Sequence, residues 1–387
     1  MIQRHLDKAL STHFDRYKEA IILLGARQVG KTTILKRLFQ GATYLTLDNE
    51  STRNILERYD VSAYQQLVID TSNVLIVDEI QELSDPGRCA KIFYDQFPQI
   101  HLILTGSSAL NIKNKTSESL AGRKIDYNIY PLTLSEYLVQ TNLEKELSLS
   151  PIMDIIAGKN PQEIIRPYDY HAIIENILIY GQYPAMLTHP KRNLYLNNLV
   201  SSTIFKDLLE LELLENKRAA HSLLKLLAHQ IGNLINYAEL ATRLNIDSRT
   251  VKRYIELFEQ SYIIFRLYPY STNKRDEIGK SPKIYFHDLG VRNALVGDWS
   301  PLQSRGDAGA LFENFVISEL NKYLHYSQLD YNFNYWRTTN GAEVDLVISN
   351  PSQVVAIEIK SKARRVNQSF VIRYPGSRQI VITPENF

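Results

Sequence analysis

Cysteine is almost absent from this sequence: Cys89 is the only one among 387 residues. A single cysteine excludes an intramolecular disulfide framework and a four-cysteine zinc site, and it is typical of a reducing compartment. The apolar stretch at 20–26 is far too short to span a bilayer, and the first ten residues lack the apolar core of a secretory signal. These absences predict a cytoplasmic protein without a membrane partner.

The sequence also lacks an excess of either charge, since 44 Lys and Arg residues face 42 Asp and Glu residues. This balance excludes a polycationic nucleic-acid-binding tail and an acidic solvating chain. A nucleic-acid partner would therefore have to meet a local basic patch. With 44% hydrophobic residues, the composition is typical of a globular protein, and the length predicts two or three domains.

Short apolar segments alternate with helical stretches in the first third of the chain. They are the run that ends at Gly25 and residues 43–48, 73–81 and 101–108. The alternation predicts a doubly wound α/β fold with a mostly parallel sheet. Each segment is apolar over nearly its whole length, as expected for strands that are covered on both faces.

A phosphate-binding loop follows the first of these segments, because residues 25–32 fit G-x-x-x-x-G-K-[ST]. Its glycines let backbone amides approach phosphate oxygens, and the following helix points its positive end at them. Lys31 is predicted to reach the β- and γ-phosphates of ATP, and Thr32 to bind Mg²⁺. The strand and helix on either side favour this function over a chance match. The predicted nucleotide-binding residues are Gly25, Ala26, Arg27, Gln28, Val29, Gly30, Lys31, Thr32 and Thr33.

Polar residues that follow the next strands complete a predicted ATPase site. Asp78 ends an apolar strand and is predicted to hold the Mg²⁺ shell, while Glu79 polarises the attacking water. Ser107, like its neighbour Ser108, is predicted to sense the γ-phosphate, with a helix N-cap as the alternative. Arg123 is a candidate for stabilising charge in the transition state, with a surface arginine as the alternative.

The segments GARQVGKTT, VLIVDEIQ, LTGSSA and LAGRKIDYNIYPLTLSEYL resemble a large prokaryotic family of AAA-type ATPases with a C-terminal domain of unknown function. The resemblance covers nearly the whole chain. It implies ATP hydrolysis, a five-stranded core sheet and a helical lid, but no settled biological role. Family members share an Arg-Asp step that is Lys206-Asp207 here. Lysine keeps the charge but loses the bidentate fork of arginine.

Residues 217–269 predict a winged helix. A first helix begins near Tyr237, residues 245–247 form the turn, and Ser248 caps a helix that is followed by a strand. The second helix carries Arg249, Lys252 and Arg253 near its start, where a DNA-binding protein places base and phosphate contacts. The segment has eight Lys or Arg residues against four Asp or Glu residues. The alternative is a winged helix that serves for packing or nucleotide sensing.

Acidic residues gather near the C-terminus on segments that resemble the PD-(D/E)XK nuclease core. Glu313 lies on the apolar face of a predicted helix. Later strands place Glu358 and Lys360 two positions apart, hence on one face. Carboxylates of this kind hold Mg²⁺ or Mn²⁺ in metal-dependent phosphodiesterases, and a lysine stabilises the transition state. The predicted ligands of this second metal site are Glu313, Glu343, Asp345 and Glu358, with Lys360 as the catalytic lysine. An inactive descendant of the fold is the alternative, and the basic run 360–365 is either a phosphate rail or a solvated loop.

Together these features predict four parts: an AAA-type P-loop domain at 1–140, a helical lid at 141–216, a winged helix at 217–275 and a nuclease-like α/β domain at 276–387. The predicted function is ATP hydrolysis coupled to DNA binding, with DNA cleavage by the last domain. The alternative is an ATP-dependent switch whose C-terminal domain binds a protein or a nucleic acid without cutting it. The sequence leaves open whether the chain forms oligomers.

Overall fold

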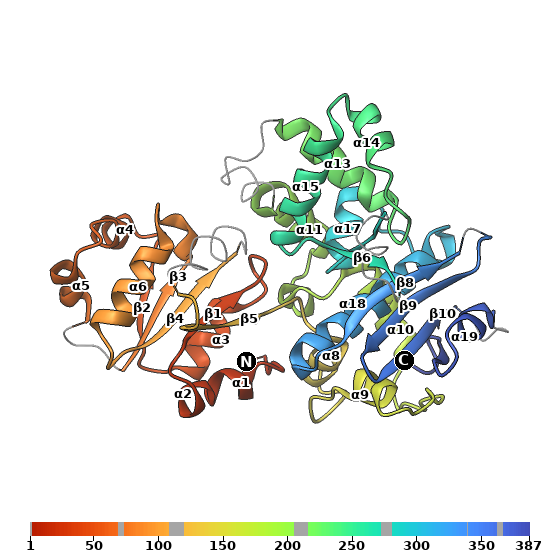
Figure 1. The fold of residues 1–387 in the computed structure, drawn as a ribbon, viewed down its shortest axis with the longest axis horizontal. Coiled ribbons are helices and arrows are strands. Elements are labelled where there is room, and N and C mark those ends of the chain that lie inside the picture. The colour runs from red at the N-terminus through yellow and green to blue at the C-terminus, as the bar shows by residue number, and fades with distance from the viewer. Residues whose placement is uncertain are drawn as a thin grey trace. The chain divides into compact units, whose positions relative to one another are not determined.

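The computed structural model describes residues 2–68, 73–107, 120–204, 216–271, 281–338, 340–361 and 367–387 (Figure 1). The predicted residues Ser108, Lys206 and Asp207 and most of the run 360–365 lie outside these ranges. The chain forms two compact units. The first holds residues 1–130 and 260–262, and the second holds residues 131–259 and 263–387. Within the described ranges, every helix is too short or too polar to cross a membrane.

The first unit is built on a five-stranded sheet whose strand pairs are all parallel, in the order β2-β3-β4-β1-β5. The strands are β1 (Ala20–Leu24), β2 (Thr43–Thr46), β3 (Val74–Asp78), β4 (His101–Gly106) and β5 (Lys124–Asn128). The parallel α/β sheet of the prediction is confirmed. Its fifth strand was implied by the family resemblance alone, because β5 has the mixed sequence KIDYN.

Helices precede the first strand and occupy connections between the later ones. They are α1 (Asp7–Ser11), α2 (His13–Arg16), α3 (Lys31–Leu38), α4 (Glu50–Leu56), α5 (Val61–Val68) and α6 (Pro86–Gln96), with a 3₁₀ turn η1 (Ile80–Glu82). The start of α6 shows how sequence sets such a boundary. The side chain of Asp85 accepts a hydrogen bond from the backbone N–H of Arg88, and Pro86 occupies the first turn.

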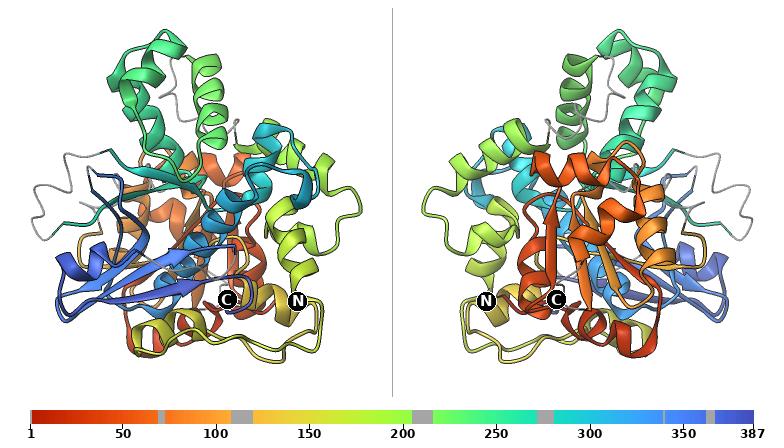
Figure 2. Two further views of the ribbon diagram at one scale, coloured as in Figure 1. Left: turned by 90° about the vertical axis from the view of Figure 1, so that its right-hand side faces the viewer. Right: turned by 90° about the vertical axis from the view of Figure 1, so that its left-hand side faces the viewer.

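The second unit begins with helices. They are α8 (Leu134–Gln140), α9 (Ser150–Ile156), α10 (Tyr170–Tyr180), η2 (Pro184–Leu187), α11 (Arg192–Asn198) and the π-helical η3 (Leu199–Ile204). Next come α13 (Lys217–His229), α14 (Tyr237–Leu244) and α15 (Ser248–Gln260). Figure 2 shows α13, α14 and α15, in green, projecting from the rest of this unit. Asp247, rather than the predicted Ser248, caps α15, because its carboxylate accepts from the backbone N–H groups of Arg249 and Thr250 at 2.8 and 2.9 Å.

A six-stranded mixed sheet forms the rest of the second unit, in the order β11-β10-β9-β8-β6-β7. Its strands are β6 (Ile264–Pro269), β7 (Lys283–Phe286), β8 (Asn332–Arg337), β9 (Glu343–Asn350), β10 (Gln353–Ile359) and β11 (Arg378–Ile382). The accompanying helices are α17 (Leu289–Val296), η4 (Leu302–Ser304), α18 (Ala308–Ser327) and α19 (Ser369–Arg373). From α18 to β11 the order helix, three strands, helix, strand is the order that the sequence predicts.

The strands that follow α15 join the C-terminal sheet. β6 pairs antiparallel with β7 along one edge and parallel with β8 along the other. Residues assigned by the sequence to two separate parts, 217–275 and 276–387, therefore contribute neighbouring strands to one sheet. The predicted boundary at 275/276 falls between the two strands of the β6–β7 pair. Side chains at the start of β7 consequently lie on the same sheet as those of β9 and β10.

Candidate functional sites: the phosphate loop, α15 and two carboxylate–lysine groups

The phosphate loop connects β1 to α3, and its first glycine is required by packing. A Cβ atom at Gly25 would lie 2.2 Å from the carbonyl oxygen of Ile129, which no side chain can tolerate. Gln28 and Gly30 both adopt left-handed backbone conformations, with φ of 64° and 101°. Such a sequence of conformations turns successive backbone N–H groups toward one side of the loop. The buried side chain of Arg4 supports the loop from outside the motif, donating a 2.8 Å hydrogen bond to the carbonyl oxygen of Val29.

Lys31 begins α3, and its side chain is buried within the curve of the loop. Its ammonium group donates hydrogen bonds to the carbonyl oxygens of Gly25 and Ala26 at 2.9 and 3.2 Å. A carboxylate oxygen of Glu79 lies 3.9 Å away. The positive charge is thus held between the loop and the end of β3. Thr33, the last of the predicted nucleotide-binding residues, is exposed on α3.

Asp78, at the end of β3, accepts three side-chain hydrogen bonds. Thr32 donates to Oδ2 at 3.1 Å, and the hydroxyls of Tyr44 and Thr105 donate to the two carboxylate oxygens. Burial and the bond to Asp78 raise the pKa of the Tyr44 hydroxyl, so it remains a protonated donor. The Thr32 hydroxyl and the Asp78 carboxylate therefore lie together as oxygen ligands suited to Mg²⁺. Tyr44 lies on the neighbouring strand β2 and belongs to no motif that the sequence displays.

Glu79 has a left-handed backbone conformation with φ of 59°, which turns the chain directly after β3. Gln81 donates hydrogen bonds to the Glu79 carboxylate and, at 3.2 Å, to the Ser107 hydroxyl. The structure thus brings Ser107 and Glu79 together through a glutamine that the sequence analysis missed. Arg123 lies apart from this group, because it pairs with Asp95 at 2.9 Å and is partly exposed.

The predicted DNA-binding side chains lie on the outer face of α15. Arg249 and Lys252 are exposed and Arg253 is half-buried, whereas Val251 and Tyr254 face the core. Residues 245–247 connect α14 to α15, and Asn245 adopts a left-handed conformation there with φ of 52°. The spacing of 249, 252 and 253 places all three on one side of the helix. This arrangement is a helix-turn-helix with a basic outer face.

Two carboxylate–lysine groups occupy the C-terminal sheet. In the first, the ammonium of Lys360 lies 3.6 Å from Asp345 and 3.4 Å from Glu358. Burial raises the pKa of Glu358, although Lys360 opposes the shift. Burial lowers the pKa of Lys360, but Asp345 and Glu358 raise it by more. The predicted E-x-K pair therefore does face the predicted aspartate.

The second group combines Glu313 of α18 and Glu343 of β9 with Lys283, which starts β7. Lys283 lies 3.7 Å from Glu313 and forms an ion pair with Glu343. The Tyr285 hydroxyl donates to Glu313 at 2.7 Å. Burial raises the pKa of Glu313, while the charge of Lys283 lowers it. Lys283 does not stand out in the sequence, since a lysine at a strand end is usually a surface residue.

The predicted second metal site stays a prediction, because nothing in this arrangement shows it. In the parts of the chain with described coordinates, no three His, Cys, Asp or Glu side chains form a group that could hold a metal ion. The four predicted ligands adjoin two lysines: Lys360 lies beside Asp345 and Glu358, and Lys283 lies beside Glu313 and Glu343. The charge of Asp345 also acts on Glu313, so the two groups are neighbours. In the arrangement shown, the two lysines compensate the charge of these carboxylates.

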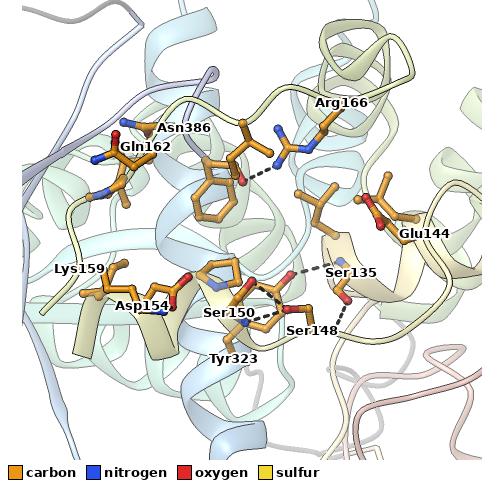
Figure 3. Close-up of a pocket in the computed structure, with 18 of the residues that line it drawn as sticks. Ser135, Glu144, Ser148, Ser150, Asp154, Lys159, Gln162, Arg166, Tyr323 and Asn386 are labelled. Atoms are coloured by element: carbon orange, nitrogen blue, oxygen red, sulfur yellow. Dashed lines mark hydrogen bonds and ion pairs between the residues drawn. The ribbon is translucent and has the colours of Figure 1, made fainter. Parts of the chain in front are cut away.

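A separate cavity of about 430 Å³ in the second unit contains none of the predicted site residues (Figure 3). Its polar side chains are largely paired with one another. Lys159 pairs with Asp154 at 2.8 Å, Arg166 donates to the backbone oxygen of Phe387, and Ser135 accepts from the N–H of Ser148.

Comparisons with known proteins agree with the first unit. Residues 17–138 match the family model of an AAA domain, and residues 171–301 and 308–386 match two domains of unknown function, DUF8612 and DUF4143. An uncharacterized protein of Methanocaldococcus jannaschii is 28% identical over 95% of this chain and 81% of its own length. An uncharacterized protein of Mycobacterium tuberculosis is 26% identical over 94% and 78%.

Among solved structures, a Walker-type ATPase of Pyrococcus abyssi has a TM-score of 0.49 at 15% identity, covering 76% of this chain and 96% of that one. The family match and the loop geometry together make the first unit an AAA-type P-loop ATPase domain. The predicted ATP-binding ATPase is confirmed at this level.

Proposed function

We propose that this chain is an ATP-driven switch that binds DNA through α15 and does not cut it. The observation that carries DNA binding is the basic outer face of α15, with Arg249 and Lys252 exposed beside Arg253. A helix that follows a three-residue turn and presents basic residues from its first turns is suited to enter the major groove. Phosphate contacts from these residues would position the protein on the duplex.

In the ATPase unit, the residues of the loop and of the ends of β3 and β4 have distinct roles. Thr32 and Asp78 would hold Mg²⁺, which supplies charge neutralisation at the β- and γ-phosphates when it is bound. Lys31 releases the carbonyl oxygens of Gly25 and Ala26 and transfers its hydrogen bonds to phosphate oxygens. Glu79 orients the attacking water, and Gln81 holds the Glu79 carboxylate and the Ser107 hydroxyl in fixed relation.

Binding without cleavage is favoured by the pairing of the C-terminal carboxylates. Metal-dependent phosphodiesterases bring several carboxylates to one Mg²⁺, and the described ranges contain no group of three such ligands placed to hold a metal ion. Here Asp345 and Glu358 share Lys360, and Glu313 and Glu343 share Lys283. The αβββαβ order and the E-x-K pair support descent from a nuclease-like fold, and the pairing supports its use as a binding module.

The test is fluorescence anisotropy with a labelled DNA duplex, titrated at several salt concentrations with ATP present. Arg249→Glu with Arg253→Glu should weaken binding by more than tenfold, and should lower the slope of log K against log salt by about two. Arg58→Glu with Lys91→Glu, two exposed positions of the first unit, changes the net charge equally and should leave affinity nearly unaltered. Equal affinity in wild type and the α15 variant would show that α15 serves for packing.

A nuclease assay tests the second half of the proposal. Plasmid and single-stranded DNA incubated with Mg²⁺ or Mn²⁺, with and without ATP, should remain intact. Cleavage that disappears in Lys360→Ala would assign a nuclease instead and overturn the non-cleaving switch. Anisotropy measures DNA binding and the nuclease assay measures cleavage, so the two parts of the proposal are tested separately.

A further inference from the structure

Lys283 is a buried cation in an unusual position. Its side chain is only 4% exposed, although it is the first residue of β7. Its ammonium lies between the carboxylates of Glu313 and Glu343, and 5.7 Å from the ring centre of Tyr335. A buried ammonium is costly unless opposite charges compensate it. Two carboxylates on different elements supply that compensation.

The surroundings of the two carboxylates hold them against Lys283. Tyr285 donates a hydrogen bond to Glu313, and Arg337 lies 3.7 Å from Glu343. On the other side, a Cβ atom at Gly232 would come within 3.1 Å of a Glu313 carboxylate oxygen, so the backbone there already approaches closely. Leu234 forms a β-bridge with Lys283 itself. The backbone of Lys283 is thus paired on this side, and its side chain is buried against its charge partners.

Lys283 differs from Lys360 in how freely it can leave its partners. The Lys360 side chain is 37% exposed, so it can turn into solvent without losing its hydration. The Lys283 side chain is only 4% exposed, so leaving both partners would strand two buried carboxylates without a cation. Positive charge between Glu313 and Glu343 is thus a permanent part of the fold, whereas the charge between Asp345 and Glu358 is displaceable.

We propose that Lys283 is a built-in cation that takes the place of a divalent metal between Glu313 and Glu343. Mg²⁺ binds oxygen ligands at about 2.0–2.1 Å, and Mn²⁺ prefers the same carboxylate ligands. An ammonium seated between the two carboxylates occupies that space and cancels their charge. Removal of the Lys283 charge converts the pair into a divalent-cation site. The inference concerns metal affinity alone and stands whether or not α15 binds DNA.

The test is Mn²⁺ binding by isothermal titration calorimetry to the full chain without nucleotide. Lys283→Met should bind one additional Mn²⁺, at least about tenfold more tightly than any wild-type site at the cluster. The thermal unfolding midpoint of Lys283→Met should be lower than that of wild type, because two buried carboxylates lose their partner. Mn²⁺ should raise it again. The double variant Lys283→Met with Glu313→Gln is the control. It retains any Mn²⁺ that binds at the phosphate loop, but it lacks the Glu313 carboxylate, so it should lose the additional site.

Two results would overturn the proposal. One is a folded Lys283→Met variant whose Mn²⁺ binding equals that of wild type. The other needs no Lys283 variant: Mn²⁺ binding by wild type that is lost in Glu313→Gln would show that a metal enters with the lysine in place. If Lys283→Met does not fold, Lys283→Gln takes its place, because its amide retains polar contacts. The comparison of Mn²⁺ binding by wild type and by Glu313→Gln needs neither variant.

Discussion

Lys322 and Glu319 form an ion pair of 3.0 Å on α18, and solvent reaches neither side chain. The pair is fully satisfied by hydrogen bonds. Lys322 also donates to the carbonyl oxygen of Leu132 at 3.0 Å, and Glu319 accepts from the backbone N–H of Leu134 at 2.7 Å. Gln182 bonds to both charged groups. This network fixes the segment at 132–134, which follows the ATPase unit along the chain, to the helix that also carries Glu313.

Lys322→Met should destabilise the second unit by about 3–5 kcal/mol, because it leaves Glu319 charged and unpaired in the interior. Tryptophan fluorescence during urea unfolding measures this directly, since both tryptophans, Trp299 and Trp336, lie in the second unit. Lys159→Met breaks an exposed pair with Asp154 and should cost no more than about 1 kcal/mol. Similar losses for the two variants would contradict the role of the buried network.

Gly25→Ala should abolish nucleotide binding. The added methyl group would lie 2.2 Å from the Ile129 carbonyl oxygen, so either the loop or the segment after β5 must shift. Binding of a fluorescent ATP analogue measures the loss, and far-UV circular dichroism verifies that the chain remains folded. Gly309→Ala serves as the control, because nothing lies within 4 Å of its Cβ position and alanine suits its helix. Normal affinity in Gly25→Ala would mean that the loop tolerates the shift.

The sequence predicts those parts of the fold that depend on local pattern. Strands β1, β3 and β4 are continuous apolar runs, and the phosphate loop is a motif of fixed spacing, so both are visible without the structure. The strand that follows the second helix of the predicted winged helix is also visible, but the pairing of β6 with β8 is not. That pairing joins segments more than 60 residues apart, and no local signal encodes it.

Side chains whose roles depend on distant partners escape sequence analysis. Tyr44 contacts Asp78 across neighbouring strands, and Lys283 is neutralised by Glu313 and Glu343 from later elements. An isolated tyrosine on a strand, or a lysine at a strand end, is usually an ordinary surface or packing residue. The same limit applies to the predicted metal centre, since the four carboxylates are visible in the sequence and the neighbouring Lys283 is not.

The stability of the second unit should fall in mild acid because of His287. Its side chain is buried, and burial lowers its pKa to about 3, with Lys322 and His325 adding repulsion. In the unfolded chain a histidine titrates near pH 6.5. Between these two pH values only the unfolded chain binds the proton. The free energy of unfolding therefore decreases as the pH falls below about 6.5, by up to about 1.4 kcal/mol per pH unit.

Urea unfolding at pH 7.5 and 5.5, followed by tryptophan fluorescence, measures this dependence. His287→Phe keeps an aromatic ring next to Phe265 and removes the titrating group, so its loss between the two pH values should be smaller by about 1 kcal/mol. Burial raises the pKa of the neighbouring Asp288, which acts in the opposite sense at lower pH in both proteins. Equal pH dependence in wild type and variant would remove His287 from this role.

Glu79→Gln should separate ATP binding from ATP hydrolysis. The amide keeps the size of the side chain and its contact with Gln81, but it is a poor base, so it cannot draw a proton from the attacking water. We expect affinity for a fluorescent ATP analogue within about threefold of wild type, and phosphate release slower by about 10²-fold or more.

Lys31→Ala should instead lose binding, because the ammonium that contacts the loop carbonyls is gone. Gln81→Ala should slow phosphate release less than Glu79→Gln, since Gln81 only positions the carboxylate. Full turnover by Glu79→Gln would assign water activation to another group.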